Sequence, residues 1–307
     1  MARYHGSELV PQDTRRYVGR TTKRPRKGDI SWASTFAPLP ADPRCVYPAT
    51  VLARSVTRPH PNLKVQARHN VADFLATQTE PRYAIRINGL DTPWWEDDLR
   101  ATVVGGVALA SIVVPKVETV GQLELIDAVL GELDPEGFVR TQALIETALG
   151  MRDVDLLASS SPRLDTLVLG YADLSASLRR PIGRPANFAW LAVQDRIMLA
   201  ARCNGLAAMD GPWLKFDDQI AGRQNNRQAV DMGFDGKWAI HPCQVADIHY
   251  AFSPSEEEIA AARSVVEAFD LASSEGAAVV AVDGLMIDAP VADAARAVLA
   301  RVGGPGR

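Results

Sequence analysis

The chain has 307 residues, of which 47% are hydrophobic, and a formal net charge of −4. This composition excludes intrinsic disorder, a collagen-like chain and a disulfide scaffold, and it can supply a large core. An acidic chain also lacks the clustered cations that nucleic-acid binding needs. The length fits about two ordinary domains, or one α/β barrel of about 250 residues with extensions.

Cysteine usage and hydropathy both indicate a cytoplasmic protein. Cys45, Cys203 and Cys243 lie far apart and form no C-x-x-C pair, so we expect reduced thiols. The longest uncharged run, residues 101–115, is shorter than the roughly 20 residues that cross a bilayer, and we expect no signal peptide. We therefore predict a cytoplasmic location with no membrane and no nucleic-acid partner.

The first 29 residues are polar, basic and without periodicity, which predicts an N-terminal arm. The first 27 of them hold eight basic and only two acidic residues. The arm is either a flexible or surface-laid tail, or a segment that contributes to subunit contacts or phosphate binding.

Short apolar runs rich in β-branched residues alternate with helical patterns from about residue 81 onward. The predicted strands are, in chain order, Arg82–Ile87, Ser111–Val114, Ala143–Ile145, Thr166–Leu169, Leu206–Met209 and Trp238–Ile240. The predicted helices are Val120–Leu130, Ala186–Asn204, Asp217–Met232 and Ser255–Phe269. This alternation is typical of βαβ units and a parallel sheet. Six repeats without a G-x-G-x-x-G turn favour a TIM-type (β/α)8 barrel over a dinucleotide-binding sheet.

A closed barrel needs two more strands before residue 81, for which the candidates are Ile30–Phe36 and Cys45–Leu52. Only residues 37–44 separate them, fewer than the dozen or so that a parallel crossover requires. We therefore expect the N-terminal strands to be atypical.

Charged side chains follow the predicted strands, at the barrel edge where active sites are built. Arg86 ends the first strand, where a lone guanidinium among apolar residues needs either a structural ion pair or a bound anion. Lys116 and Glu118 follow the second strand and either pair with each other, cap the next helix or contact a substrate. His241 follows the sixth strand, as a ligand contact or as a support for one.

Two carboxylates, Glu146 and Asp173, end neighbouring predicted strands 27 residues apart. Like charges side by side repel unless a cation bridges them. Mg²⁺ suits such a pair because it binds through one or two carboxylates and keeps waters or substrate oxygens. The alternative is that both residues cap helices. The sequence contains no zinc spacing, no G-x-S-x-G elbow and no P-loop.

Several motifs occur in a fixed order along roughly residues 64–292. They are RINGLDTPW (86–94), VPKVE (114–118), LIET (144–147), GYADLS (170–175), MDGP (209–212), FDDQIAG (216–222), DGKWAIHP (235–242) and DGLMID (283–288). On these motifs the chain resembles the citrate lyase β-subunit family, the branch of the HpcH/HpaI aldolase group that includes malyl- and citramalyl-coenzyme A lyases.

The resemblance implies a TIM-type barrel over residues 30–252, a C-terminal helical lid over residues 253–307, and a homotrimer or dimer of trimers. It implies Mg²⁺ held by Glu146 and Asp173, and a keto acid of the glyoxylate, pyruvate or oxaloacetate class held by Arg86. Asp288 would act as the acid/base group in a neighbouring subunit's site. The implied activity is Mg²⁺-dependent carbon–carbon cleavage or formation of a short β-hydroxyacyl-coenzyme A thioester, with Lys116, Glu118 and His241 near the substrate.

One segment departs from the family. Lys64, Ala67 and Arg68 match a family segment, but the family's acidic run before it is replaced by residues 51–56, which hold no carboxylate. Two alternatives stay open for this reason: a catalytically degenerate homologue that binds coenzyme A esters or metal, and an aldolase that acts on free keto acids.

Overall fold

The computed structural model describes residues 34–35, 52–55, 61–79, 83–104, 108–181, 188–282 and 284–302. The chain divides into two compact units between Ser31 and Trp32, and all described residues belong to the second. The predicted arm at 1–29 and most of the two N-terminal strand candidates lie outside the described residues.

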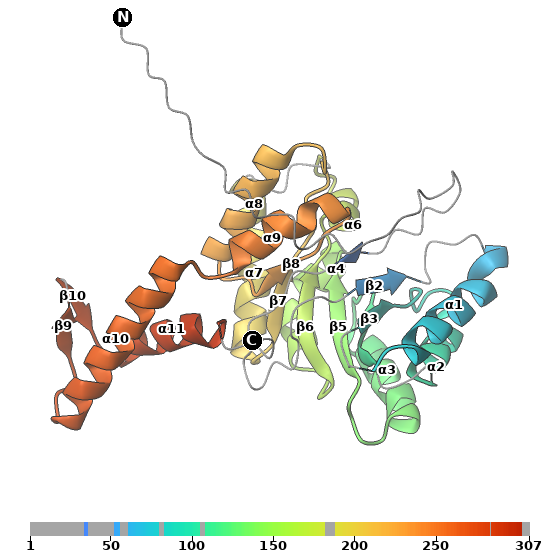
Figure 1. Cartoon of the computed structure of the whole chain (residues 1–307). Helices are drawn as coiled ribbons and strands as arrows, with labels where there is room; N and C mark the ends of the chain where they lie inside the picture. The colour runs from blue at the N-terminus through green and yellow to red at the C-terminus, as the bar shows by residue number, and fades with distance from the viewer. Residues whose placement is uncertain are drawn as a thin grey trace, which may run out of the picture. The chain divides into compact units, whose positions relative to one another are not determined.

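Eight strands form one sheet in which spatial order follows chain order (Figure 1). The strands are β1 (Ser34–Thr35), β2 (Leu52–Ser55), β3 (Tyr83–Arg86), β4 (Leu109–Val114), β5 (Arg140–Ile145), β6 (Leu164–Leu169), β7 (Ala207–Asp210) and β8 (Gly236–Lys237). Every neighbouring pair from β2 to β8 is parallel. The predicted α/β class is confirmed, with a half-barrel of parallel strands.

The N-terminal end of the sheet is atypical, as expected. Strand β1 pairs antiparallel with β2, with Ser34 opposite Ala53. An antiparallel pair can use a short connection, whereas a parallel pair needs a long crossover. Among the described residues no pairing joins β8 to β1, so closure of the barrel stays a prediction.

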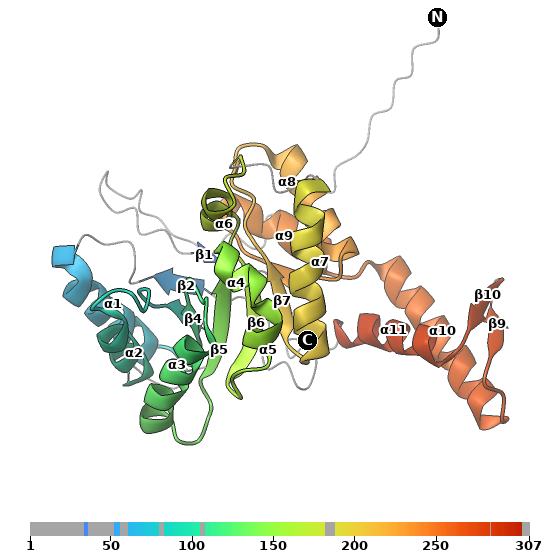
Figure 2. The ribbon, with the colours of Figure 1, turned by 180° about the vertical axis from the view of Figure 1, so that it is seen from behind.

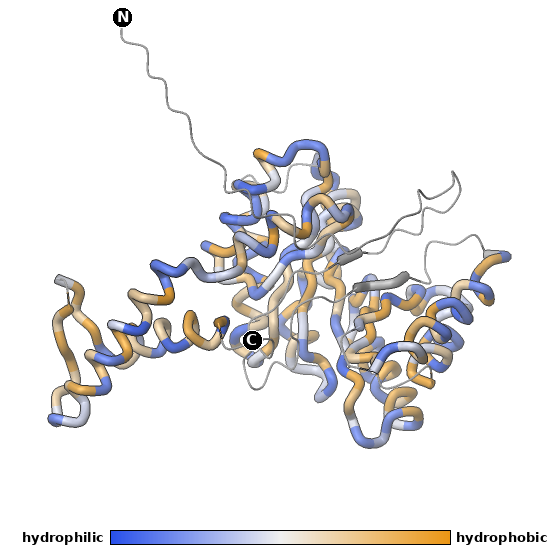
Figure 3. The backbone as a smooth tube through the Cα atoms, viewed as in Figure 1, coloured by the Kyte–Doolittle hydropathy of each residue, from blue (hydrophilic) through white to orange (hydrophobic). Residues whose placement is uncertain are grey.

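Helices follow the strands along the chain. They are α1 (Lys64–Ala76), α2 (Trp95–Val104), α3 (Val120–Leu133), α4 (Ala148–Arg152), α5 (Val154–Ala158), α6 (Tyr171–Ser177), α7 (Phe188–Cys203), α8 (Gln219–Asp231), α9 (Val245–Phe252), α10 (Glu256–Ser274) and α11 (Ala289–Ala300), with 3-10 turns η2 (Pro61–Leu63) and η3 (Pro242–Gln244). Helix α7 packs on β6 and β7, as Figure 2 shows from behind. Hydrophilic and hydrophobic residues alternate along the helices in Figure 3, the pattern of helices with one buried face.

The four predicted helices and five of the six predicted strands are confirmed, with ends shifted by a few residues. The sixth strand lies two residues earlier than predicted: β8 ends at Lys237, and of the predicted residues Trp238–Ile240 only Trp238 continues the pairing, as a β-bridge. Trp238 still donates its backbone N–H to the Asp210 carbonyl at 2.9 Å, and its side chain is buried inside the sheet's curve. The apolar run therefore reflects burial rather than a continued strand.

Side chains alternate between the two faces of the sheet along each strand, so the protein has two separate hydrophobic cores. The inner core, on the concave face, contains Ala84, Val113, Leu144, Val168, Met209 and Trp238. The larger outer core lies between the strands and the helices. Because side chains alternate between the faces of a strand, the residues two positions further on share the concave face. Those residues are Arg86 after Ala84, Glu146 after Leu144 and Gly170 after Val168.

The C-terminal elements form a module of their own. Helix α10 packs against α11 and against β9 (Val280–Val282), which pairs antiparallel with β10 (Leu285–Ile287). Ser255 and Glu258 form a capping box at the start of α10, as the predicted cap requires. The role of this module as a lid, and the boundary at residue 253, stay predictions. No helix in the described part of the chain is both long and apolar enough to cross a membrane.

Candidate active site

The carboxyl ends of β3, β5, β6 and β8 surround a pocket of about 350 Å³. Arg86, Glu146, Asp173 and His241 line it. Four of the seven side chains predicted from the sequence thus meet in one cavity, although they are spread over 155 residues of chain from 86 to 241. Parallel strands make this possible because all their carboxyl ends lie at one edge.

Arg86 and Glu146 face each other across this pocket. Arg86 Nη2 lies 3.5 Å from Glu146 Oε1, and the two side chains are 29% and 3% exposed. The Arg86 Nε atom is buried and has no hydrogen-bond partner among the described residues. Of the two alternatives expected for Arg86, the ion pair therefore exists. One N–H of the guanidinium still has no protein partner and could bind an anion.

The environment of Glu146 disfavours its charge. Burial, and to a smaller extent the nearby Asp173 carboxylate, raise the pKa of Glu146 to about 7. Arg86, together with the Lys116 amide and side chain, lowers it, but not enough to offset burial. A carboxylate held in this way is stabilised by any additional cation, because a positive charge offsets both desolvation and repulsion.

Gly170 has no side chain, and this leaves the space that Glu146 occupies. Ile145 and Leu169 are register partners of β5 and β6, so Glu146 and Gly170 come next on adjacent strands. A Cβ atom on Gly170 would lie 2.5 Å from the Glu146 Cβ and 2.9 Å from its Oε2. The sequence motif contained this glycine, but only the strand register shows why a side chain does not fit there.

Asp173 lies in the first turn of α6, whose first residue, Tyr171, is anchored in the protein interior. The Tyr171 hydroxyl donates to Asp210 Oδ1 at 2.5 Å and accepts from Gln194 Nε2 at 2.7 Å. Asp210 also pairs with Lys237, and neither side chain has any exposure. This network from four elements holds the start of α6, and the sequence analysis did not single it out.

Lys116 approaches Glu146 through its backbone. Its φ of 51° lies in the left-handed region, which costs energy for a residue with a side chain, and its N–H donates to Glu146 Oε1 at 3.2 Å. A second pocket of about 320 Å³ lies beside this contact, lined by Lys116 and Glu118 and sharing Glu146 and Asp173 with the first. Lys116 and Glu118 form no ion pair in the described structure, so the predicted alternative of mutual pairing is wrong.

The helix-cap alternative is wrong for Glu146, since Thr147 caps α4 by accepting the Gly150 N–H at 3.1 Å. For Asp173 it is also wrong, since Gly170 holds the N-cap position of α6.

Asp288 is the N-cap of α11 and accepts the Val291 N–H at 3.3 Å. Asp288 does not line either pocket of the described residues that contains Glu146.

Lys64 and Arg68, which matched the family segment, form buried hydrogen bonds next to the end of β3. Arg68 Nε donates to the fully buried Asp98 at 2.6 Å, and Asp98 accepts the Asn88 amide side chain and its N–H. Lys64 Nζ donates to Asn88 Oδ1 at 2.8 Å. Because Asn88 follows Arg86 by two residues, this buried network fixes the end of β3. The sequence analysis missed Asp98, which is one of three acids at the start of α2.

The donor set around Glu146 fits Mg²⁺. Arg86 and the Lys116 N–H both contact Oε1 of the carboxylate, and Oε2 accepts no hydrogen bond from the described residues. Glu146 and Asp173 would supply the one or two carboxylates that Mg²⁺ typically uses in proteins. Three or more His, Cys, Asp or Glu side chains do not converge anywhere in the part of the chain that the structure describes.

Comparison with known proteins identifies the family of the chain. The model of the HpcH/HpaI aldolase/citrate lyase family matches residues 58–242. The chain belongs to the HpcH/HpaI aldolase/citrate lyase family. An L-malyl-CoA/beta-methylmalyl-CoA lyase of Cereibacter sphaeroides is 33% identical over 254 residues, which cover 74% of this chain and 79% of the relative. The predicted family is thus confirmed, and both pockets lie largely within the matched range.

Two further relatives extend the comparison. The citrate lyase subunit beta of Leuconostoc mesenteroides subsp. cremoris is 30% identical and covers 77% of this chain and 80% of its own. The crystal structure of CitE from Mycobacterium tuberculosis is 30% identical, with a TM-score of 0.66, and covers 83% of this chain and 90% of its own. That crystal contains magnesium, acetoacetate and coenzyme A.

Proposed function

We propose that this protein is a Mg²⁺-dependent carbon–carbon lyase that cleaves or forms a short β-hydroxyacyl-coenzyme A thioester, such as malyl-, citramalyl- or citryl-coenzyme A. The observation that supports it most is the buried Glu146, whose raised pKa, open Oε2 and neighbouring Asp173 suit a divalent cation. Lyases with coenzyme A ester names and a magnesium-containing CitE structure are similar to the chain over most of its length.

In this proposal, Glu146 and Asp173 hold Mg²⁺ and Arg86 binds the carboxylate of a keto acid of the glyoxylate, pyruvate or oxaloacetate class. When bound, the cation polarises the oxygens of the hydroxy or keto acid as a Lewis acid. The unpartnered Nε of Arg86 offers a second donor beside Nη2, which allows a bidentate contact with a carboxylate. Leu144 and Trp238 form an apolar floor that excludes water from the reacting atoms.

The second pocket is the place we assign to the thioester end of the substrate, because it shares Glu146 and Asp173 with the first. Lys116 and Glu118 line it, and His241 lines the first pocket. Asp288 would act as acid/base group from a neighbouring subunit, in a homotrimer or dimer of trimers. A closed (β/α)8 barrel, a C-terminal lid over residues 253–307 and a cytoplasmic location belong to the same proposal.

The test is a product assay with malyl- and citramalyl-coenzyme A in the presence of Mg²⁺. Formation of a free keto acid and acetyl-coenzyme A in equal amounts is expected, with loss in Arg86→Gln and Asp173→Asn. Arg152→Gln is the matched control, because Arg152 is an exposed arginine that is paired with Asp153 and lines neither pocket. Thioester binding without turnover would support the degenerate homologue instead. Equal turnover of free hydroxy acids would support the aldolase on free keto acids.

A further inference from the structure

A cysteine and a histidine meet at the edge of the main pocket. His241 Nδ1 lies 2.9 Å from Cys243 Sγ, and Cys243 is a free, exposed cysteine. The 3-10 turn η3 produces this pairing because His241 caps it and Cys243 is its second residue. The proposed lyase reaction does not use this thiol.

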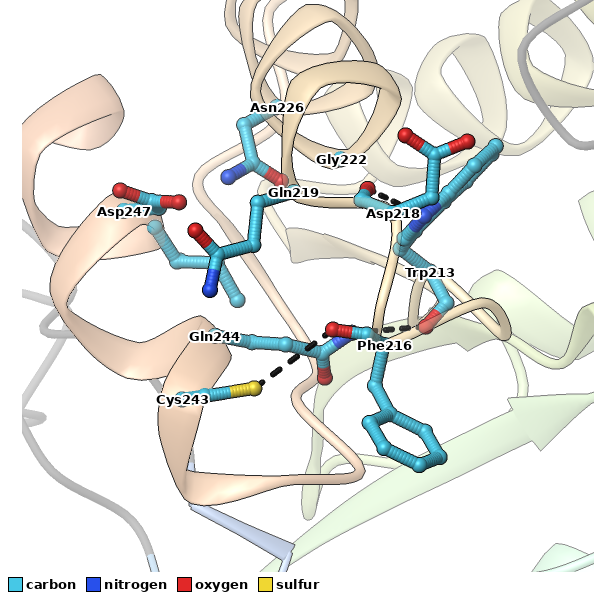
Figure 4. Close-up of a pocket in the computed structure, with 10 residues that line it drawn as sticks. Trp213, Phe216, Asp218, Gln219, Gly222, Asn226, Cys243, Gln244 and Asp247 are labelled. Atoms are coloured by element: carbon cyan, nitrogen blue, oxygen red, sulfur yellow. Dashed lines mark hydrogen bonds between the residues drawn. The ribbon is translucent and has the colours of Figure 1, made fainter.

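The backbone decides which atom carries the proton. The Cys243 N–H donates to His241 Nδ1 at 3.2 Å, so this nitrogen presents its lone pair. In the 2.9 Å contact the thiol must then be the donor and the imidazole the acceptor. The other acceptor near the sulfur, the Phe216 carbonyl oxygen, is farther away at 3.6 Å (Figure 4). A thiol that can pass its proton to a neutral imidazole is the arrangement that activates cysteine nucleophiles.

The thiol also lies between two cavities. Cys243 lines a cavity of about 20 Å³ together with Phe216, while Phe216 and His241 line the main pocket. The rings of Phe216 and His241 are stacked, with centroids 4.9 Å apart and an interplanar angle of 15°. The small cavity has room for about one water molecule. A larger group added to the sulfur does not fit in this cavity and would lie against the Phe216–His241 stack at the edge of the main pocket.

We propose that Cys243 is a modification site that exchanges with small-molecule disulfides, and that the modified protein loses access to its substrate pocket. The thiol transfers its proton to His241 Nδ1, and the sulfur attacks one sulfur of the disulfide. A new S–S bond forms, the disulfide's own S–S bond breaks, and the departing thiolate takes the proton from the imidazole. Reduction by an added thiol reverses the exchange.

The chain offers a matched control in Cys203, which is also free and exposed but forms no contact with a histidine in the described structure. The probe is 5,5′-dithiobis(2-nitrobenzoate) with the full-length protein at neutral pH, and peptide mass mapping assigns each modified cysteine. We expect Cys243 to react roughly 100-fold faster than Cys203, at the low end of what a positioned proton acceptor contributes. His241→Asn should remove this advantage without changing the rate at Cys203. Equal rates at the two cysteines in the unmodified sequence would overturn the proposal.

The reactivity is independent of the proposed lyase function, and only its effect on the substrate pocket rests on that function. Pyruvate binding, measured by calorimetry with Mg²⁺, should fall as Cys243 is modified and return with dithiothreitol, while Cys243→Ser binds pyruvate and resists the reagent. Full pyruvate binding by completely modified protein would overturn the effect on the pocket. Absence of pyruvate binding before modification would count against the proposed function instead, and the reaction rates would still test the thiol.

Discussion

Replacing Glu146 by glutamine removes a buried ionisable group and keeps the size of the side chain. In the folded protein, burial raises the pKa of Glu146 from 4.5 to about 7. Between these two values the folded state keeps a proton that the unfolded state has released, so the free energy of unfolding falls as the pH rises. The interval of about 2.5 pH units corresponds to about 3 kcal/mol, at about 1.4 kcal/mol per unit.

Glu146→Gln does not ionise, and it should therefore lose none of this stability. The assay is urea unfolding of both proteins at pH 5 and pH 8.5 in the presence of a chelator. The advantage of Glu146→Gln over the original protein should grow by about 2.5 kcal/mol between the two pH values, because the carboxyl of the unfolded protein has already lost most of its proton at pH 5. Glu118→Gln, a carboxylate-to-amide change at a half-buried position beside the same cluster, is the matched control.

Adding Mg²⁺ at pH 8.5 should reverse the order. A ligand that binds only the folded state stabilises it by mass action, so the original protein should gain stability while Glu146→Gln gains none. Two results would refute the reasoning. A stability difference that is unchanged between pH 5 and pH 8.5 would show that Glu146 is not held in a charge-disfavouring environment. Equal stabilisation of both proteins by Mg²⁺ would remove Glu146 from the metal site.

Two further changes test the surroundings of this carboxylate. Gly170→Ala places a Cβ atom 2.5 Å from the Glu146 Cβ, and it should lower Mg²⁺ affinity about 10- to 100-fold in a calorimetric titration, whereas Gly131→Ala, with nothing within 4 Å, should not. Wild-type affinity in Gly170→Ala would contradict the packing argument. Lys237→Met leaves Asp210 buried without its cation and should cost about 3–5 kcal/mol in urea unfolding. A loss below about 1 kcal/mol would show that the pair is not desolvated as the structure indicates.

Much of the fold could be predicted because its signals are local. A strand such as β4 is a continuous run of buried apolar residues, and α10 begins with a cap and three acids in its first turn. The sixth strand was predicted two residues too late, because an apolar run such as Trp238–Ile240 indicates burial, and burial continues past the last residue of β8. Atypical N-terminal strands were expected from the short link at residues 37–44 between the two strand candidates, whereas the antiparallel pairing of β1 with β2 was not predicted.

The position of Arg86, Glu146 and Asp173 at strand ends was enough to predict that they share a site, because parallel strands bring their carboxyl ends to one edge. Their chemistry was not predictable in the same way. The raised pKa of Glu146 comes from burial by residues distant in sequence, and the need for Gly170 comes from the register of β5 against β6.

The sequence by itself thus determined the order of strands and helices, the family and the identity of the pocket's charged residues. Only the tertiary structure decided which charges are buried together, as in Asp210 with Lys237. It also decided which hydrogen-bond donors remain without a protein partner, as in Arg86 Nε. It also paired Cys243 with His241 in a geometry that makes the thiol a donor. The reason is physical: secondary structure follows from short-range periodicity, whereas desolvation and hydrogen-bond geometry depend on contacts between distant segments.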